Sequence, residues 1–245
     1  MTPSSASGDP VSISIVMPAY NEATIIERSL GELLSGLRAR GEPFEIVVVE
    51  NGSTDDTERR ARAVAETSPE VHVLHRALAD YGNALRDGML AARGAIVVNF
   101  DCDYYDLGFV ARAVDRIREP ERPATIVVGS KRAPGADDRR HWSRRFVTAT
   151  FSTMLRIGFG LTVTDTHGMK ALLREPLLPV VERCRYGRDL FDTELILRAE
   201  RAGLVVAEIP VDVEELRPAR TSIIRRIPRS LSGLARLWFS LRRPE

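Results

Sequence analysis

The chain has 245 residues, of which 44% are hydrophobic and 28% charged, so it is long enough to bury a substantial core. This balance excludes a disordered, collagen-like or coiled-coil protein, and no run approaches the roughly 18 apolar residues of a membrane span. The two cysteines form no disulfide framework, and residues 1–10 are a polar tail rather than a signal peptide. We therefore expect an intracellular protein.

The net charge of +1 hides an asymmetry along the chain. Residues 217–245 hold eight Arg and one acidic residue, whereas the remainder has an excess of acidic residues. A basic tail of this kind favours a polyanionic partner, either a nucleic acid or an anionic membrane face. A solvated helix end is the simpler alternative.

Strands and helices alternate through the first half of the chain. Apolar β-branched runs predict strands, and apolar residues at helical spacing predict helices between them. The predicted strands are residues 11–17, 44–49, 71–74, 95–100 and 124–128, and the predicted helices are residues 22–40, 53–67, 83–93 and 107–118. This alternation predicts an α/β fold with a mostly parallel central sheet flanked by helices.

The second half is less regular. Its expected elements are a long helix over 142–159, a strand over 168–173, a helix over 189–202, a strand over 204–209 and two amphipathic helices within 221–243. With no internal repeat and no long linker, we expect a flexible N-terminal tail (1–10), one catalytic domain (11–216) and basic amphipathic C-terminal helices (217–245).

Polar residues follow three of the predicted strands. They occupy residues 18–22 (Pro-Ala-Tyr-Asn-Glu), 50–56 (Glu-Asn-Gly-Ser-Thr-Asp-Asp) and 101–103 (Asp-Cys-Asp). Ligands of open α/β sheets bind outside the carboxyl ends of the strands. We therefore expect the three loops to form one site for a ligand rich in hydrogen-bonding groups.

Asp101 and Asp103 carry the most chemical information. Two carboxylates one residue apart can share a divalent cation, or divide between a cation and a sugar hydroxyl. Mg²⁺ and Mn²⁺ prefer oxygen ligands and often complete their shell with substrate phosphates, so a cation here would neutralise a diphosphate leaving group. The alternative is that Asp103 or Asp106 caps a helix. Placement directly after a buried strand favours the cation.

In combination, these runs resemble the family-2 inverting glycosyltransferases of the GT-A fold. The resemblance rests on residues 16–22 and 48–55, followed by residues 82–94 and the Asp101-Cys102-Asp103 run. Later residues resemble the polyprenyl-phosphate sugar synthases of the dolichyl-phosphate mannose synthase type. They are Gly129-Ser130-Lys131, Trp142, Arg145, Asp165, Gly168-Met169-Lys170, residues 191–195 and residues 208–211.

The resemblance implies roles for residues on the donor side. The implied nucleotide-sugar-binding residues are Pro18, Tyr20, Glu22, Glu50, Asn51, Gly82, Asp101 and Asp103, and the implied ligands of Mg²⁺ or Mn²⁺ are Asp101 and Asp103. Glu50 stands where the family usually has the Asp that reads the base edge, so the resemblance leaves GDP and UDP both open. Tyr105 stands where the metal loop often has Gln, so coordination would rely on water and the diphosphate.

The resemblance also implies an acceptor side. A lipid monophosphate is already an anionic nucleophile near neutral pH, so it needs positioning and charge compensation more than a strong base. The implied acceptor-phosphate-binding residues are Lys131, Arg132, Arg144, Arg145, Thr148 and Arg217, and the implied catalytic residues are Asp103, Lys131, Arg145 and Asp192. A basic loop with no fixed role is the alternative for residues 131–145.

Five further polar residues allow more than one interpretation. Asp192 and Glu194 face different sides of a predicted helix, so we expect one to approach the site and the other to cap or pair. Asp165 fits a buried hydrogen-bond partner as well as a catalytic residue. His75 and His167 lack metal-ligand spacing, and we interpret both as structural.

The C-terminal segment alternates apolar residues with Arg and contains Trp238 and Phe239. An amphipathic, Arg-rich helix with aromatic residues can lie in the membrane interface. This predicts a protein peripheral to the cytoplasmic face of the cell membrane. Packing of the same residues on the body or across a dimer is an alternative that is compatible with membrane contact.

Three functions follow. The first is a hexosyltransferase that moves a sugar with inversion from a GDP- or UDP-sugar to a polyprenyl monophosphate, using Mg²⁺ or Mn²⁺. It would act without nucleic acid, as a possible homo-oligomer or partner of a membrane protein. The second is a family-2 glycosyltransferase with a soluble or glycan acceptor. The third is a degenerate nucleotide-sugar-binding partner protein, for which the departures from the family at Glu50, Tyr105, Arg220 and Ile223 argue.

Overall fold

A computed structural model describes residues 11–133, 135, 150, 153–187, 190–212, 232–234 and 236–240. The first half of the chain forms β1 (Ile13–Ala19), α1 (Ile26–Arg40), β2 (Phe44–Asn51), α2 (Thr57–Thr67), β3 (Val71–Arg76), α3 (Tyr81–Ala91), β4 (Ile96–Asn99) and α4 (Leu107–Arg118). The second half forms β5 (Ile126–Ser130), β6 (Lys170–Leu173), α6 (Arg174–Arg183), α7 (Phe191–Arg201) and β7 (Val206–Pro210).

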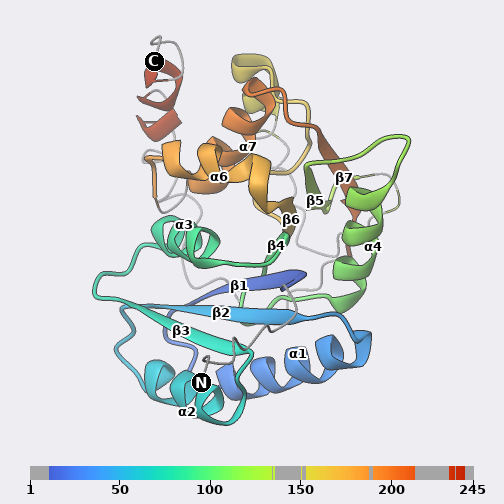
Figure 1. The fold of residues 1–245 in the computed structure, drawn as a ribbon. Helices are drawn as coiled ribbons and strands as arrows, with labels where there is room; N and C mark the ends of the chain where they lie inside the picture. Colours follow the sequence, from blue (N-terminus) through green and yellow to red (C-terminus); the bar gives the residue numbers. More distant parts are fainter. Residues whose placement is uncertain are drawn as a thin grey trace, which may run out of the picture.

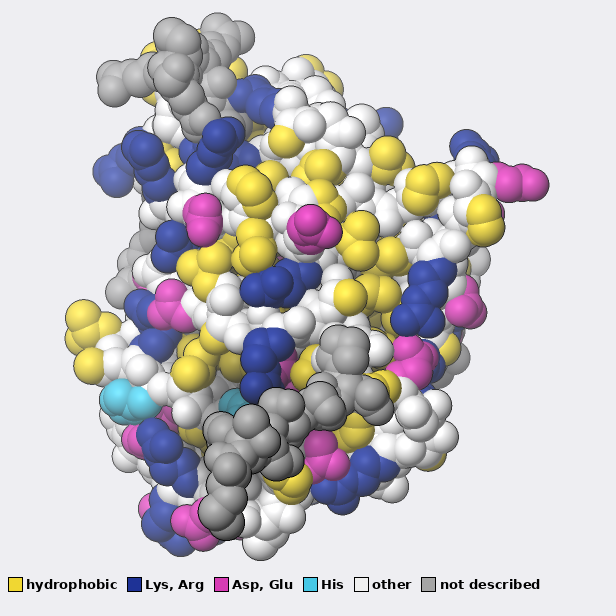
Figure 2. All heavy atoms as spheres, in the orientation of Figure 1, with side chains coloured by type: hydrophobic (Ala, Val, Ile, Leu, Met, Phe, Trp, Pro, Cys, Tyr) yellow, Lys and Arg dark blue, Asp and Glu magenta, His cyan; other side chains and the backbone are white. Residues whose placement is uncertain are grey.

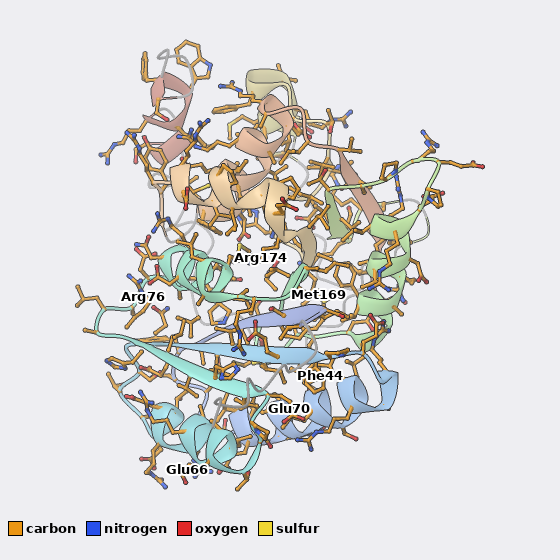
Figure 3. All side chains as sticks on the ribbon, in the orientation of Figure 1. Phe44, Glu66, Glu70, Arg76, Met169 and Arg174 are labelled. Carbon is orange, nitrogen blue, oxygen red and sulfur yellow. The ribbon has the colours of Figure 1, made fainter. Side chains whose placement is uncertain are left out.

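The strands form a seven-stranded sheet in the order β3-β2-β1-β4-β6-β5-β7. Neighbouring strands are parallel except at β6, which runs antiparallel to both β4 and β5. Phe44 at the start of β2 and Arg76 at the end of β3 are labelled in Figure 3, as are Met169 and Arg174, which flank β6. The predicted α/β fold with a mostly parallel sheet is therefore confirmed.

Helices cover both faces of this sheet (Figure 1). Apolar side chains of α1, α2 and α4 share one core cluster with one face, and those of α3, α6 and α7 share a second cluster with the other. β1 is buried along its whole length, as expected for a central strand of a parallel sheet with helices on both sides. This two-sided burial explains the continuous apolar runs of the first strands.

One helix, α6, has no counterpart among the predicted elements. It contains Pro176 in its first turn and Pro179 in its interior. Proline removes an intrahelical hydrogen bond and commonly ends helices, so the run gives no helical signal. The helix forms because it buries Leu177, Val180 and Val181 against the sheet. Of the long helix predicted over 142–159, residues 153–159 are helical and residues 142–149 lie outside the described part.

The described part of the C-terminal segment, residues 232–234 and 236–240, is helical and packs on the body. Leu234 and Leu237 are buried in the core cluster of α7, whereas the side chain of Phe239 is 62% exposed. The packing on the body that was expected as an alternative is therefore observed for Leu234 and Leu237, whereas membrane contact stays a prediction. Among the described helices, none is long and apolar enough to cross a membrane. The predicted domain boundaries fall at residues outside the described part.

Candidate active site

The loops after β1 and β2 are held together by their own hydrogen bonds. The backbone N–H of Asn21 donates to Ser53 Oγ (3.0 Å), and the N–H of Thr54 donates to Asn21 Oδ1 (2.8 Å). The N–H of Glu22 donates to Thr57 Oγ1 (2.7 Å). Asn21 adopts a left-handed backbone (φ 55°), which Asn tolerates better than most residues. Two runs far apart in the sequence therefore form one rigid edge, with Tyr20 exposed on it.

Glu50, the predicted base-reading residue, is 1% exposed at the end of β2. One of its carboxylate oxygens accepts from the N–H of Ser53 (2.5 Å), and the other lies 2.7 Å from His75 Nδ1. In this structure Glu50 thus fixes the loop after β2 and orients His75. Its contact with a nucleotide base stays a prediction.

The neighbouring Asn51 and Gly82 connect this edge to α3. Asn51 Oδ1 accepts from the N–H of Asp80 (2.8 Å), the residue that caps α3. Gly82 is buried in the first turn of that helix. The amino end of α3 therefore lies against the end of β2, where backbone N–H groups favour anions.

Asp101 and Asp103 lie on a tight turn directly after β4. Asp101 and Tyr104 form an isolated antiparallel bridge, with both backbone N···O distances at 3.2 Å. Asp103 is exposed at the tip of the turn, whereas Asp101 is partly buried. Asp106 caps α4 by accepting from the N–H of Gly108 (2.7 Å). The capping role proposed as an alternative thus belongs to Asp106, and the described contacts give Asp103 no such role.

Asp101 has an unusual protonation equilibrium. Burial, together with the carboxylates of Asp192 and Asp103, raises the pKa of Asp101 to about 6, although a hydrogen bond from Tyr81 and the charge of Lys170 lower it. The Tyr81 hydroxyl donates to Asp101 Oδ1 at 2.9 Å. Asp101 is therefore oriented by a fixed donor and repelled by two neighbouring carboxylates.

Asp192 and Glu194 divide their roles as expected. Asp192, in the first turn of α7, interacts with Asp101 and accepts a 2.6 Å hydrogen bond from Lys170 Nζ. Glu194 is fully buried, accepts from the N–H groups of Arg185 and Tyr186 and pairs with Arg198. Asp192 approaches the site, and Glu194 holds the local structure.

The donor set suits a hard divalent cation. Asp101 and Asp103 offer carboxylate oxygens, which Mg²⁺ and Mn²⁺ prefer, and a cation would relieve the repulsion that raises the pKa of Asp101. Tyr105 does not stand in for the family's Gln, because its hydroxyl donates to Glu32 on α1. The two aspartates are therefore the protein ligands that the described residues offer at this position.

A different group of possible ligand atoms occurs at the ends of β2 and β3. Oxygens of Glu50 and Glu58 and a ring nitrogen of His75 lie within 4.8 Å of one another. Since His75 Nδ1 lies 2.7 Å from Glu50 and 3.2 Å from Glu58, these contacts account for the cluster. A structural role for His75 stays a prediction.

The acceptor side is only partly described. Lys131 follows β5, and its Nζ lies 5.8 Å from the ring centroid of Tyr104, next to Asp103. Arg132 is exposed, with its N–H donating to Ser130 Oγ (3.2 Å). The remaining predicted acceptor residues, Arg144, Arg145, Thr148 and Arg217, lie outside the described residues. Pro18, Tyr20, Glu22, Glu50, Asn51, Gly82, Asp101 and Asp103 all lie at one edge of the sheet.

Asp165 belongs to the loop that leads into β6. It is 4% exposed, and its Oδ1 accepts from the N–H of His167 (2.9 Å), whereas its Oδ2 is buried with no hydrogen-bond partner among the described residues. The same loop is tied to β5 and β7 through Thr164, which lies within hydrogen-bond distance of Ser130 and donates to Glu208. One carboxylate oxygen of Asp165 therefore acts as a buried hydrogen-bond acceptor, which is one of the two roles expected for this residue.

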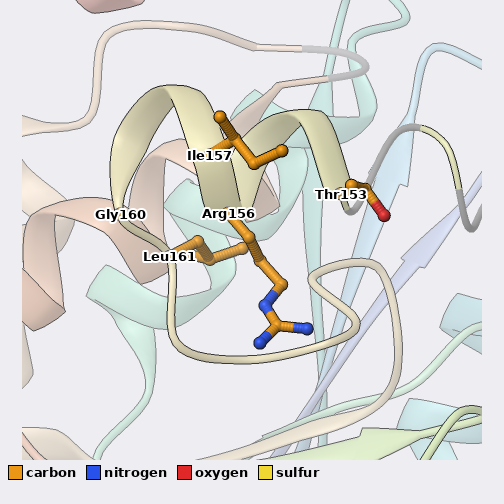
Figure 4. A pocket seen from close by; sticks show the side chains of 5 residues that line it. All are labelled: Thr153, Arg156, Ile157, Gly160 and Leu161. Atoms are coloured by element: carbon orange, nitrogen blue, oxygen red, sulfur yellow. The ribbon is translucent and has the colours of Figure 1, made fainter.

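Two open pockets accompany these elements. One, of about 450 Å³, lies beside the Asp101–Tyr104 turn and is lined by Tyr104, Tyr105, Asp106, Arg112, Gly135, Pro210 and Asp212. The other, of about 310 Å³, surrounds the end of the helix of residues 153–159 and is shown in Figure 4. There Ile157 and the Arg156 guanidinium point in different directions from the helix. The first pocket adjoins the donor edge, so an acceptor could enter beside Asp103.

On the face shown in Figure 2, Lys and Arg side chains are spread among acidic and apolar ones. The charge of this face therefore does not gather into one basic patch among the described residues.

Two contributors to the site escaped the sequence analysis: Tyr81 and Lys170. The hydrogen-bond partner of Tyr81 is Asp101, and that of Lys170 is Asp192. Each partner lies some twenty residues along the chain, so no local motif joins them. The only available signal was Lys170 itself, a charged residue opening a predicted buried strand.

The chain is similar to known glycosyltransferases. The family described as Glycosyl transferase family 2 matches residues 14–179. The chain is 30% identical over 244 residues to glycosyltransferase AglD of Haloferax volcanii, covering 98% of this chain but only 39% of that protein. It is 28% identical to dolichyl-phosphate beta-glucosyltransferase ALG5A of Trichomonas vaginalis (88% of this chain, 70% of that one). It is 30% identical to undecaprenyl-phosphate mannosyltransferase of Micrococcus luteus (82% of each chain).

Among solved structures, glucosyl-3-phosphoglycerate synthase of Mycobacterium tuberculosis, in complex with Mn²⁺, UDP-glucose and phosphoglyceric acid, superposes with a TM-score of 0.69. The two share 25% identity, and the match covers 93% of this chain and 80% of that one. A second structure of that enzyme holds Mg²⁺ and UDP, at 24% identity and a TM-score of 0.65. These neighbours support a divalent cation and a nucleotide-sugar donor, and they have the GT-A arrangement of strands and helices expected here.

Proposed function

Because the chain belongs to glycosyl transferase family 2, we propose that it transfers a hexosyl group, with inversion, from a nucleoside diphosphate sugar to a polyprenyl monophosphate. The observation that carries the proposal is the exposed Asp103 beside the partly buried Asp101 at the carboxyl end of β4. This pair adjoins the loops after β1 and β2, so donor base, ribose and diphosphate would all lie along one edge.

On the donor side, each loop has a distinct task. Tyr20 and Glu22 line the space for base and ribose beside Glu50. A bound Mg²⁺ or Mn²⁺ would neutralise the diphosphate as it leaves. Tyr81 holds one oxygen of Asp101 in place, so the carboxylate meets the donor in a fixed orientation. Fixed groups lower the barrier because they need no rearrangement in the transition state.

On the acceptor side, a phosphate oxygen attacks the anomeric carbon while the bond to the diphosphate breaks. The acceptor oxygen already carries negative charge, so the protein must mainly position it and offset its charge. Lys131, held over the Tyr104 ring next to Asp103, has the place and charge for that task. Two relatives named for dolichyl phosphate and undecaprenyl phosphate support a lipid acceptor.

Membrane contact would bring the enzyme to such an acceptor. Ile157 is 83% and Phe239 62% exposed, next to the exposed Arg156 and near the exposed Arg236 in sequence. Their two helices, one yellow and one red in Figure 1, lie at the end of the molecule away from α1 and α2. Apolar tips flanked by Arg favour an anionic lipid surface, so we place the enzyme peripherally on the cytoplasmic membrane face.

A soluble phosphorylated acceptor is the second candidate. It is favoured by the structural match to a synthase solved with phosphoglyceric acid, which covers most of both chains. The open pocket beside the Asp101–Tyr104 turn would suit either acceptor, because it offers polar groups and two tyrosine rings.

The deciding experiment is a transfer assay with radiolabelled GDP- and UDP-sugars, Mg²⁺ or Mn²⁺, and vesicles containing a polyprenyl monophosphate. We expect label in an organic-extractable, mild-acid-labile product. A parallel reaction with phosphoglyceric acid and no lipid tests the second candidate. Label in the aqueous phosphoglycerate product alone would replace the lipid acceptor by a soluble one. Nucleotide binding without transfer to any acceptor would contradict both.

A further inference from the structure

Lys170 is a cation with no contact with solvent. It opens β6, is 0% exposed and is among the largest fully buried side chains. Its Nζ donates to the carbonyl of Gly168 (2.8 Å) and to Asp192 Oδ1 (2.6 Å). Lysine is almost never fully buried unless it is paired, and here its ion-pair partner is an aspartate at the donor edge.

A buried pair of this kind is poorly explained by stability alone. Removing two charges from water costs several kcal/mol per ion, and apolar residues of similar volume often stabilise a fold equally well. Leu172 on β6 and Phe191 on α7, close to the pair along the chain, belong to the second core cluster, so apolar residues are compatible with this part of the fold. The position of the pair therefore calls for a functional explanation.

The pair is the inner end of a row of charges. Lys170 is 0% and Asp192 5% exposed; Asp101 is partly buried and Asp103 exposed. Electrostatic interactions link Asp101 to Asp192, Asp103 and Lys170. When all four are ionised, three carboxylates stand against one ammonium, which leaves two negative charges for a divalent cation to balance.

The backbone supports this row. The carbonyl that receives Lys170 belongs to Gly168, and a Cβ on Gly168 would lie 2.1 Å from the Gly129 carbonyl oxygen. The Gly129 N–H in turn donates to the Met169 carbonyl (2.8 Å). The approach of β5 to the loop before β6 therefore fixes where the Lys170 ammonium lies.

We propose that Lys170 is a positioning residue for glycosyl transfer: its ammonium holds Asp192 against the donor site and allows three carboxylates to converge there. The proposal rests on the proposed donor chemistry but not on the identity of the acceptor. Asp192 is the residue that would touch the donor sugar, and Lys170 acts through it.

The test compares Lys170→Met, Asp192→Asn and the double variant. We expect Lys170→Met to lower kcat for transfer or donor hydrolysis about 100-fold, the loss typical of a misplaced active-site group. Its affinity for Mn²⁺ with a nucleoside diphosphate, measured by calorimetry, should stay within about threefold or tighten, because the site loses a positive charge. The double variant should be no slower than the slower single variant, because the two residues act as a unit.

Arg198→Met is the matched control. It removes the cation of α7 that pairs with buried Glu194 at 2.8 Å, and it leaves the Lys170–Asp192 pair intact. We expect it to lower the melting temperature while kcat stays near the wild-type value. This contrast separates positioning from structural support, because loss of a structural pair lowers stability without a selective loss of kcat.

Three results would overturn the proposal: kcat of Lys170→Met within threefold of wild type, losses that multiply in the double variant, or parallel loss of melting temperature, Mn²⁺ affinity and kcat. If Lys170→Met alone does not fold, the double variant removes both charges together, and wild-type kcat there would overturn the proposal equally. Failure of the wild-type protein to bind any Mn²⁺–nucleoside diphosphate would instead contradict the proposed function.

Discussion

The proposed donor and acceptor sides of this molecule are built in different ways. Donor residues follow β1, β2 and β4, which are adjacent in the sheet, and short hydrogen bonds join the loops after β1 and β2. The described acceptor residues, Lys131 and Arg132, follow β5, which β6 separates from β4. Their described link to the donor edge is the position of Lys131 over Tyr104. The donor side is a rigid edge, and the acceptor side depends on longer connections.

The largest expected effect tests the donor edge. Asp103→Ala should reduce transfer by at least about 1,000-fold, because it removes one of two carboxylates that offset the charge of cation and diphosphate. Asp103 is exposed, so the melting temperature should stay within about 2 °C of wild type. Initial rates at saturating donor, together with thermal unfolding, measure both quantities.

Asp115→Ala is the control for Asp103, since Asp115 is an exposed aspartate of α4 that does not line the pocket beside the Asp101–Tyr104 turn. It should leave both the melting temperature and the transfer rate near wild type. Near-wild-type turnover of Asp103→Ala would contradict the assignment of Asp103 as a metal ligand. It would also show that the donor edge tolerates substitution and is not the more sensitive of the two sides.

The second prediction addresses the junction of the two sides. Gly168→Ala forces a Cβ to within 2.1 Å of the Gly129 carbonyl oxygen, so β5 or the loop before β6 must move. Overpacking of this kind costs about 1–3 kcal/mol, or roughly 5 °C in melting temperature for a chain of this size. We expect kcat to fall about 30-fold as Lys170 and Asp192 shift.

Gly158→Ala provides the comparison for Gly168→Ala, because no atom lies within 4 Å of its added Cβ. It should leave kcat unchanged and should not lower the melting temperature. Equal behaviour of the two alanine variants would show that donor and acceptor sides are not mechanically joined at Gly129 and Gly168.

The sequence predicts some residues of the candidate site and not others. Asp101 and Asp103 were predictable because polar residues directly after buried strands must lie at the sheet edge. The roles of Tyr81 and Lys170 were not, because their partners Asp101 and Asp192 meet them only through strand order and helix packing. Short sequence motifs predict local geometry, whereas contacts between distant helices and strands become visible only in the folded structure.

The same limit applies to secondary structure. The bounds of α4 agree with the prediction to the residue, because its apolar spacing and its Asp106 cap act together. α6 was missed, because Pro176 and Pro179 carry a local signal that tertiary burial of Leu177 and Val181 overrides. The prediction of a strand over 168–173 was right in type, but its antiparallel direction depends on neighbours distant in sequence.

The third prediction concerns pH and acts on the donor edge alone. Burial and the neighbouring carboxylates raise the pKa of Asp101 to about 6, above its unfolded value of about 4. In the cation-free protein, protonation of Asp101 therefore contributes to the free energy of unfolding at low pH. This contribution is lost as the pH rises through 6. A cation needs the ionised form, so its affinity should fall up to about tenfold per pH unit below 6.

Calorimetric titration with Mn²⁺ and a nucleoside diphosphate between pH 5 and 8 measures this dependence. Tyr81→Phe removes the hydrogen bond that favours the charged form, so the fall should begin at higher pH in that variant. An affinity independent of pH over this range would show that Asp101 is not a ligand, and the cation would then have to rely on Asp103.

The smallest expected effect belongs to the acceptor side. Ile157 is 83% exposed at the end of the helix of residues 153–159, and burying such a side chain in a lipid interface contributes about 1–2 kcal/mol. Ile157→Asp should therefore weaken partition onto vesicles with anionic lipid about fivefold and reduce transfer to a vesicle-borne polyprenyl phosphate by a similar factor. Affinity for Mn²⁺ with a nucleoside diphosphate should not change, because the donor edge is untouched.

Val205→Asp is the matched substitution, since Val205 is 51% exposed just before β7, on a different part of the surface. It should leave both vesicle binding and transfer unchanged. If the two aspartate variants lose vesicle binding equally, attachment is general rather than directed by the helix of residues 153–159. If both variants transfer the sugar to a soluble phosphorylated acceptor at the wild-type rate, the acceptor is a soluble phosphate. The donor and acceptor sides would then differ in the ligand that each binds and not in contact with a membrane.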